Sequence, residues 1–187
     1  MTKQELRREI RNRKTAMTAT MRSTQSRKVC ERVLQHPRWE AAHTILLYHA
    51  LPDEIDTTLL IERAGTKRLL LPVVKGEELE LREFAHKLHV GPFGILEPSE
   101  GSWVEDYQSI DLLIVPGMAF DNEGHRLGRG KGYYDKFFAK MEKSSHALQT
   151  PSACAHHYKI GICFDFQHVE AVPSEPHDVL MDEVICG

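Results

Sequence analysis

Long hydrophobic runs are missing from this sequence of 187 residues. A helix that spans a bilayer needs roughly 18 or more consecutive apolar residues, and the sequence has no such run, so we expect no membrane-spanning segment. The first residues also lack the apolar core of a secretory signal. We therefore expect a protein of the cytoplasm that has no membrane partner.

Cysteine is scarce, and no two cysteines form a Cys-x-x-Cys pair. The four are Cys30, Cys154, Cys163 and Cys186. Such wide spacing favours free thiols in a reducing compartment over a disulfide framework. The eleven histidines include no His-Glu-x-x-His motif, and the pairs His86/His89 and His156/His157 lack neighbouring cysteines or carboxylates. We therefore expect no zinc site.

A strong excess of one charge is absent too, because the formal net charge is only −3. No general positive field attracts nucleic acid, so we expect no nucleic-acid partner, and any basic site must be local. The length and the 41% content of hydrophobic residues suit one well-packed core. We expect a single domain over residues 1–187 and a monomer.

The most informative stretch that is present is a glycine-rich segment, residues 126–132, which we call the glycine loop. Glycines at 128, 130 and 132 can adopt positive φ and let a ligand approach the backbone amides. Arg126, Arg129 and Lys131 add three cations to the same segment. Amides and cations that converge on one place predict a site for a polyphosphate.

The surroundings of the glycine loop predict a strand–loop–helix unit. Residues 111–115 form a short apolar run typical of a buried parallel strand, and apolar residues spaced as in a helix follow Gly132. In α/β sheets, ligands bind beyond the carboxyl ends of the strands. A helix N-terminus there stabilises an anion by only about 0.3 to 1 kcal/mol, so the three cations are needed as well.

Two familiar phosphate motifs do not fit the glycine loop. The Walker A motif ends in Gly-Lys-Ser/Thr, whereas this loop has Gly130-Lys131-Gly132, and the third glycine of the dinucleotide fingerprint would fall at Tyr133. The loop therefore predicts neither a P-loop nor a standard NAD site. A solvated basic surface turn remains the alternative.

Elsewhere the pattern predicts an alternation of helices and strands. We expect a strongly basic helix over residues 3–20, opened by a capping box of Thr2 and Glu5, and a second helix from about Ser23 to before Pro37. Strands are expected over residues 44–48, 68–74, 78–84, 111–115 and 158–164 and at the C-terminus, with a helix over 57–64, an ordered loop over 91–98 and a flexible surface connection over 143–157.

The string Pro116–Asp121 followed by Arg126–Asp135 closely resembles the signature of the 5-formyltetrahydrofolate cyclo-ligase family. The resemblance extends in motif order over most of the chain, but residues 73–109 match poorly. It implies a single-domain α/β fold of Rossmann-like, three-layer form, with a parallel-rich central sheet flanked by helices. It also implies a ligase that uses ATP and Mg²⁺ to convert 5-formyltetrahydrofolate to 5,10-methenyltetrahydrofolate, with release of ADP and phosphate.

The resemblance also implies roles for individual residues. Arg129 and Lys131 would be catalytic, and Asp135 and Asp182 would hold Mg²⁺. The residues implied for ATP are Lys3, Arg7, Arg126, Leu127, Gly128, Arg129, Gly130, Lys131, Gly132, Tyr133 and Tyr134. Those implied for the folate are His49, Glu54, Arg129, Gly130, Lys131, Gly132 and Tyr133. A carboxylate such as Glu54 suits the pterin ring, whose amino group and ring N–H are adjacent donors.

Several alternatives stay open at this point. Lys3 and Arg7 could belong to a solvated basic face or a targeting segment. His49 could be a partly buried histidine, Asp135 could only stabilise its helix start, and Asp182 could be a turn residue. At the level of function, a sugar-phosphate isomerase, an acyl-CoA transferase or an RNA-binding module that stacks bases on tyrosines are the alternatives.

Overall fold

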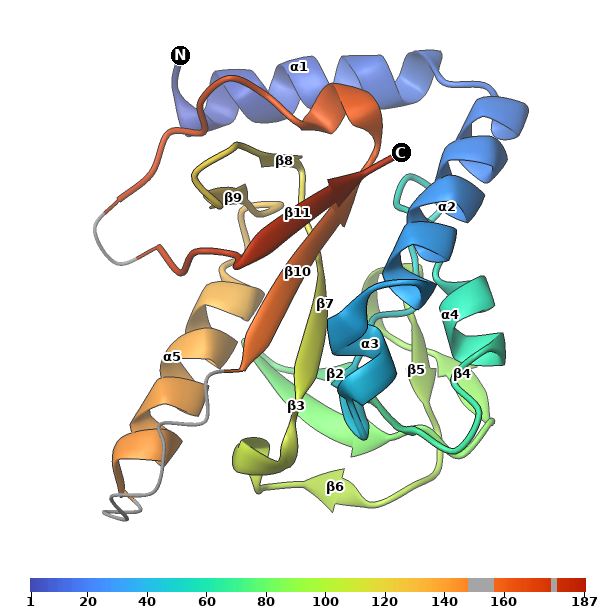
Figure 1. Cartoon of the computed structure of the whole chain (residues 1–187). Helices are drawn as coiled ribbons and strands as arrows, with labels where there is room; N and C mark the ends of the chain where they lie inside the picture. The colour runs from blue at the N-terminus through green and yellow to red at the C-terminus, as the bar shows by residue number, and fades with distance from the viewer. Residues whose placement is uncertain (148–156, 176–177) are drawn as a thin grey trace.

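In the computed structural model, which describes residues 1–147, 157–175 and 178–187, a central sheet lies between helices (Figure 1). The strand order is β11-β10-β7-β1-β2-β3-β6. The strands are β11 (Glu183–Cys186), β10 (Tyr158–Cys163), β7 (Leu112–Pro116), β1 (Thr44–Leu46), β2 (Arg68–Lys75), β3 (Glu78–Glu83) and β6 (Trp103–Val104). The five strands from β11 to β2 are parallel, and β3 and β6 join antiparallel. The predicted parallel-rich α/β sheet is confirmed.

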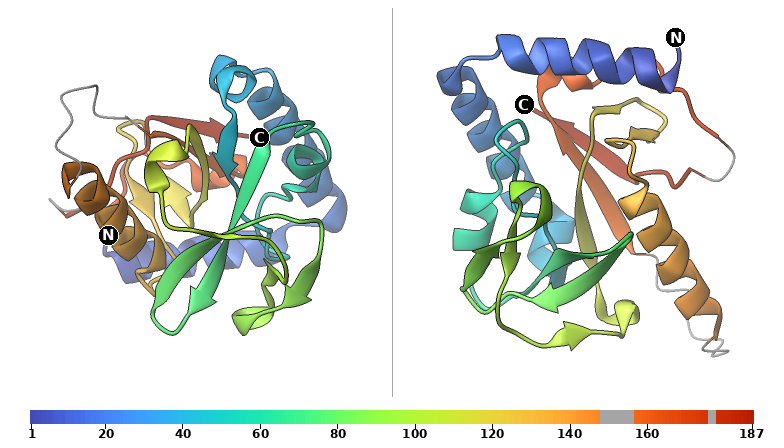
Figure 2. Two further views of the ribbon diagram at one scale, coloured as in Figure 1. Left: turned by 90° about the horizontal axis from the view of Figure 1, so that it is seen from below. Right: turned by 180° about the vertical axis from the view of Figure 1, so that it is seen from behind.

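The sheet is buried on both faces because β7 alternates its side chains between two cores. Leu112 and Ile114 belong to a core shared with three helices, α2 (Ala19–Leu34), α3 (Pro37–Ala41) and α4 (Thr58–Glu62). Leu113 and Val115 face the opposite core, which is filled by α5 (Tyr133–Ala147). The period of two along a strand separates these sets. Figure 2 shows the resulting three layers from below and behind.

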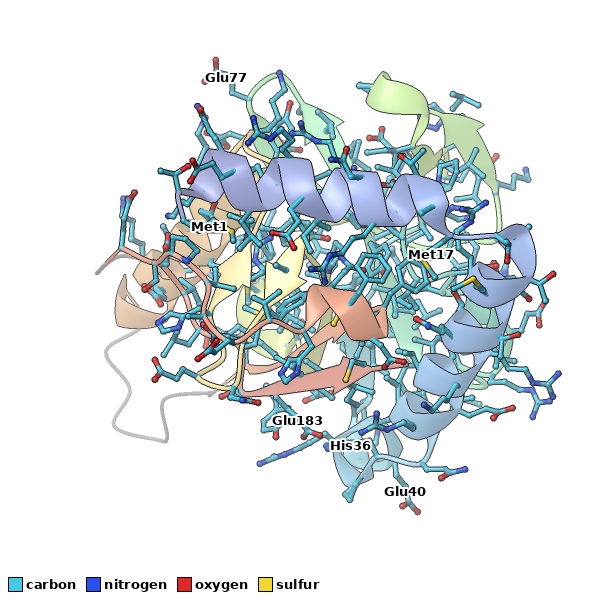
Figure 3. All side chains as sticks on the ribbon, turned by 90° about the horizontal axis from the view of Figure 1, so that it is seen from above. Met1, Met17, His36, Glu40, Glu77 and Glu183 are labelled. Carbon is cyan, nitrogen blue, oxygen red and sulfur yellow. The ribbon has the colours of Figure 1, made fainter. Side chains whose placement is uncertain are left out.

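The first helix, α1 (Lys3–Ala16), lies across the end of the sheet toward which β7 and β10 run (Figures 1 and 3). It packs Leu6 and Ile10 onto a third, smaller core that contains Met118, Ala119 and Leu127. The last two belong to a hairpin of β8 (Ala119–Phe120) and β9 (Arg126–Leu127). This packing brings the basic helix to the edge where α/β proteins bind ligands.

The helix boundaries correct the prediction for the N-terminal region. The capping box of Thr2 and Glu5 is present, but the helix predicted over residues 3–20 ends at Ala16, and the second helix starts at Ala19 rather than near Ser23. Met17 is extended, and the Thr18 side chain accepts a hydrogen bond from the backbone of Met21 as a new N-cap. A capping threonine inside a helical pattern therefore divides one predicted helix from the next.

The segment predicted as an ordered loop over residues 91–98 contains regular structure. β4 (Leu88–Val90) and β5 (Leu96–Pro98) pair antiparallel, and the 3₁₀ turn Pro92–Gly94 lies between them. The predicted 143–157 connection is helical up to residue 147, and residues 148–156, with Cys154, lie outside the described residues. Within the described ranges, no helix has the length and apolar character needed to cross a membrane.

Candidate active site

A cavity of about 440 Å³ opens at the carboxyl ends of the central parallel strands. Its residues come from the segments that follow β1 and β7, from β2 and β3, from the β4–β5 hairpin, from the glycine loop and from the start of α5. Pro72, Val74, Leu79 and Ile95 give it an apolar wall, and the glycine loop gives it a cationic one. The cavity therefore offers an apolar and an anion-binding part side by side.

The glycine loop leads from β9 into α5, and the helix predicted after Gly132 is present. The predicted strand before the loop is β7, and the β8–β9 hairpin, which was not predicted, lies between them. Gly130 and Gly132 have φ values of +104° and +69°, which residues with a Cβ rarely adopt. Arg7 of α1 donates a hydrogen bond from Nε to the carbonyl oxygen of Gly128, at 2.8 Å. The structure thus brings Arg7 to the glycine loop, although the two are 121 residues apart.

Lys3 lies in a different environment from Arg7. Its Nζ is 2.9 Å from Asp178 and 3.5 Å from Glu175, in the segment that precedes β11. Burial lowers the pKa of Lys3, but the two carboxylates outweigh it and raise this pKa overall. The structure therefore places Lys3 against the C-terminal segment, without a contact to the glycine loop among the hydrogen bonds and ion pairs of the described residues.

Arg129 joins the glycine loop to the segment after β1. Its guanidinium lies 2.6 Å from Asp53 and 2.8 Å from Glu54. Burial lowers the pKa of Arg129, but Glu54 and Asp53 raise it by more, so the net shift of this pKa is upward. Lys14 of α1 lies 3.3 Å from the other oxygen of Asp53. The four charges form a chain from α1 to Glu54, and we call these four residues the charge chain.

Burial has opposite effects on the pKa values of Lys14 and Asp53, the first two members of the charge chain. The side chain of Lys14 is only 4% exposed, and this burial lowers its pKa although Asp53 raises it in part. Burial also raises the pKa of Asp53, but the hydrogen bond from Arg129 and the charge of Lys14 lower it more. Asp53 is therefore held ionised between two cations.

Arg126, at the start of the glycine loop, is oriented from three sides. Its Nη2 donates to Asp135 at 2.7 Å and its Nη1 to the carbonyl oxygen of Pro116 at 3.3 Å. The guanidinium also lies 5.3 Å from the centre of the Tyr134 ring, a cation–π distance. Only 5% of this side chain is exposed, so Arg126 is fixed before any ligand arrives.

The two tyrosines that open α5 pack inward against the core under that helix. The Tyr133 hydroxyl donates to the carbonyl oxygen of Gly76 at 3.2 Å. Burial raises the pKa of the Tyr134 hydroxyl. Both line the cavity, together with His49, Glu54, Lys131 and Gly132. The inward packing of these rings disfavours the exposed stacking platform that an RNA-binding module uses.

The two predicted magnesium ligands have different surroundings. Asp135 lines the cavity and is 48% exposed at its side chain. Asp182 accepts a hydrogen bond from the backbone N–H of Lys159 at 2.7 Å, and it is not among the described residues that line the cavity. No group of three or more metal-binding side chains occurs within the described ranges. An oxygen ligand beside a phosphate site fits Mg²⁺, and Asp135 meets that condition.

Three charged residues of the site were missed by the sequence reasoning. Lys14 had a visible signal, because it continues the buried Leu6 and Ile10 at a spacing of four, where an apolar residue belongs. Asp53 adjoins Glu54, but nothing in the pattern distinguished its role. Glu97 lines the cavity from β5, in the region predicted as a loop.

Comparison with known proteins agrees with this geometry. The family model for 5-formyltetrahydrofolate cyclo-ligases matches residues 1–187. The chain belongs to the 5-formyltetrahydrofolate cyclo-ligase family. Membership confirms that it is an enzyme, with small-molecule substrates in folate one-carbon chemistry, and a family of this kind implies ATP as co-substrate.

Individual relatives cover nearly the whole cyclo-ligase chain. The "Probable 5-formyltetrahydrofolate cyclo-ligase" of Schizosaccharomyces pombe is 34% identical over 87% of this chain and 83% of its own. The Escherichia coli K12 5-formyltetrahydrofolate cyclo-ligase is 32% identical over 94% and 95%. The solved 5,10-methenyltetrahydrofolate synthetase of Aquifex aeolicus has a TM-score of 0.82 and 32% identity over 100% of this chain and 90% of its own. The family model and the Aquifex aeolicus structure also cover the segment over residues 73–109, where the resemblance was poor.

Proposed function

We propose that the enzyme uses ATP and Mg²⁺ to cyclise 5-formyltetrahydrofolate to 5,10-methenyltetrahydrofolate, releasing ADP and phosphate. One observation carries this proposal: a single cavity is lined both by the cations of the glycine loop and by His49 and Glu54. A phosphate-binding loop and a carboxylate-bearing apolar pocket thus open into one space. That arrangement suits a reaction in which a phosphoryl group passes from a nucleotide to a second, largely apolar substrate.

The reaction needs activation because a formyl oxygen leaves poorly. The formyl oxygen attacks the γ-phosphorus of ATP, and ADP departs. N10 of the folate then bonds to the activated formyl carbon, loses its proton, and expels the oxygen as inorganic phosphate. Phosphoryl transfer of this kind depends on positioning and charge neutralisation more than on a general base, which matches a site rich in cations and glycine amides.

We assign the nucleotide to the glycine loop, with Arg7 beside it. The amides from Gly128 to Gly132 would bind the phosphates, and Arg129 and Lys131 would neutralise the charge on the transferred group. Tyr133 and Tyr134 would border both substrates, and Lys3 would act from α1, where it pairs with Asp178 of the C-terminal segment. Leu127 and Arg126 would hold the entry of the loop in place from β9.

We propose Asp135 as the principal protein ligand of Mg²⁺, with Asp182 as a second ligand. The ion, when bound, neutralises phosphate charge and orients the phosphate oxygens. Asp135 is well placed because Arg126 contacts only one of its two oxygens among the hydrogen bonds of the described residues. Asp182 would have to exchange its hydrogen bond to Lys159 for the ion.

The experiment that tests the proposed function is a spectrophotometric assay for the methenyl product. The purified enzyme is given 5-formyltetrahydrofolate with ATP and Mg²⁺ together, with each alone and with neither. We expect product only when both are present, with one ADP and one phosphate released per product. Product formed without ATP, or ATP hydrolysis uncoupled from product, would contradict the proposal.

We further propose that the enzyme acts as a monomer in the cytoplasm. Cys30 and Cys163 are buried thiols, and burial raises the pKa of Cys30 to about 12, so that it stays unreactive in a reducing compartment. Sedimentation at micromolar concentration measures the first point and subcellular fractionation the second. A stable dimer, or enzyme recovered only from an organelle, would contradict them.

A further inference from the structure

Glu97 is a buried carboxylate at the wall of the cavity. It belongs to β5 of the β4–β5 hairpin, which packs beside β2 (Figure 2), and only 2% of the residue is exposed. Its Oε1 accepts a hydrogen bond from the backbone N–H of Val74 at 2.9 Å. Among the hydrogen bonds and ion pairs of the described residues, this is its only one, and no lysine or arginine pairs with it. A glutamate this buried normally has a cationic partner.

The cost of burying an ionised carboxylate means that Glu97 needs hydrogen-bond donors to replace the lost water. An ionised carboxylate withdrawn from water is costly unless hydrogen bonds or a cation replace the lost hydration. Val74 satisfies one oxygen only, so Oε2 lacks donors in the described part of the chain. The missing donors can come from a ligand, because Glu97 lines the cavity that we assign to the substrates.

The surroundings of Glu97 define the shape of that ligand. Val74, Leu79 and Ile95 line the same cavity and supply apolar surface. A flat ring with adjacent N–H donors on one edge would fit between apolar walls with its edge toward a carboxylate. The pterin ring of a reduced folate has such an edge, because its 2-amino group and its N3–H point the same way.

Glu54, the carboxylate that the family resemblance implies for the folate, already has donors. Glu54 accepts from Arg129 at Oε1, at 2.8 and 2.9 Å, and from the backbone N–H of Leu51 at Oε2, at 3.0 Å. Both of its oxygens therefore have donors before a folate binds. Asp135 also has an oxygen without a donor among the described residues, but it lies beside Arg126 and the phosphate site. Glu97 is the carboxylate beside the apolar wall with an oxygen left for the ring.

We propose that Glu97 is the residue that recognises the amino-pyrimidine edge of the pterin, and that Glu54 contributes to folate binding through Arg129 instead. This assignment rests on the proposed function, which places the folate in the cavity. The ring donors would thus be bound by the β4–β5 hairpin, and not by the segment after β1 that contains Glu54.

The position of Glu97 depends on one neighbouring glycine. A Cβ atom at Gly91 would lie 2.4 Å from both Cδ and Oε2 of Glu97, far closer than atoms can approach. The backbone of Gly91 has φ −89° and ψ −168°, which alanine also adopts. Gly91→Ala therefore displaces the carboxylate while it keeps its charge.

The first test measures Glu97→Gln. Glutamine keeps an oxygen for Val74 but turns an NH₂ group toward the ring donors, so we expect the KM for 5-formyltetrahydrofolate to rise about tenfold or more. The KM for ATP should stay within about twofold. Glu100→Gln is the matched control, since Glu100 is an exposed partner of Lys87 two residues beyond the hairpin strand. Gly91→Ala should raise the folate KM in the same direction.

A second test identifies the atom that is recognised. Calorimetric titration without ATP compares 5-formyltetrahydrofolate with an analogue that lacks the 2-amino group. We expect the wild-type enzyme and Glu54→Gln to lose about tenfold in affinity for the analogue, and Glu97→Gln to bind both compounds about equally. An unchanged folate KM in Glu97→Gln, a lower melting temperature alone, or an equal loss in all three proteins would overturn the proposal.

These outcomes are distinct from failure of the proposed function. If the wild-type enzyme forms no methenyl product with ATP, the cyclisation is wrong, whatever Glu97 does. If it forms product and Glu97→Gln behaves as the wild-type enzyme in both tests, only the inference about Glu97 is wrong.

Discussion

Arg129 and Glu54 form an ion pair although they are 75 residues apart in the sequence, with Nε 2.9 Å and Nη2 2.8 Å from the same oxygen, Oε1. We assign Arg129 to the nucleotide and Glu54 to the folate. Before either substrate binds, the two residues therefore neutralise each other. An incoming triphosphate competes with Glu54 for the guanidinium, so the two binding events are linked through this pair.

The ion pair predicts the effect of Glu54→Gln. Removing the negative charge weakens folate binding, and we expect the KM for 5-formyltetrahydrofolate to rise about tenfold. ATP affinity should be retained or increase, because Arg129 loses a competing carboxylate. Steady-state kinetics with each substrate varied in turn separates the two effects. An equal loss of both affinities would indicate a folding defect instead.

Lys131→Ala tests the catalytic role of the glycine loop. A cation that neutralises charge in the transition state is commonly worth several kcal/mol, so we expect kcat/KM to fall about 100-fold or more. Lys136→Ala is the control. Lys136 lies on α5, just after the glycine loop, and its exposed side chain pairs with Glu77. Near-normal turnover in Lys131→Ala would remove this lysine from the mechanism.

Asp135→Asn tests the assignment of the magnesium ligands. Asparagine can still accept the hydrogen bond from Arg126, so the loop should keep its geometry while the ion loses a charged ligand. We expect the Mg²⁺ concentration for half-maximal activity to rise about tenfold, and chelation with EDTA to abolish wild-type activity. Asp182→Asn measured beside it shows whether the second aspartate takes part. An unchanged Mg²⁺ requirement in Asp135→Asn would refute its assignment.

Asp121 predicts an acid-labile contribution to stability. Burial raises its pKa, but hydrogen bonds from Val172 and His125 lower it more, so its folded-state pKa lies below the ordinary value of 3.8. A carboxylate with a depressed pKa stabilises the fold above its ordinary pKa, and that stability is lost as the pH falls through the folded-state value. We expect Asp121→Asn to melt below the wild-type protein at pH 7.

The same residue also predicts how the difference changes with pH. Because only the wild-type protein has this carboxylate to protonate, the gap between the two melting temperatures should narrow as the pH falls below about 3.8. Thermal melts by circular dichroism at a series of pH values measure it. A gap that stays constant down to pH 2 would show that the Asp121 charge contributes nothing.

Local chemistry made part of this molecule predictable. Three features lie close together in the sequence: the buried strand β7, the glycine loop and the apolar stripe from Tyr133 onward. Each combines a conformational requirement with a packing requirement, so together they predicted the strand–loop–helix unit that the structure contains. Arg7 was predictable as a basic residue on α1. The family resemblance implied that Arg7 and Gly128 bind the same nucleotide, but the hydrogen bond from Arg7 to the Gly128 carbonyl oxygen was known only from the structure.

Other features depend on contacts that no short pattern records. The β4–β5 hairpin has short strands with exposed residues in β4, so it shows no clear alternation. The lack of a clear strand pattern also left Glu97 unpredicted, because its burial arises from packing against Val74 and Gly91. The division of the first two helices at Met17 depends on a single capping threonine, which a period of 3.6 residues does not reveal.

The α1 helix packs on the rest of the protein without entering either of the two large cores. Neither of the two large cores contains any residue from the first sixteen, and α1 rests on its own small cluster through Leu6 and Ile10. Yet Arg7 and Lys14 tie this helix to the glycine loop and the charge chain. A variant that lacks α1 would therefore be folded but inert, and added α1 peptide could complement it.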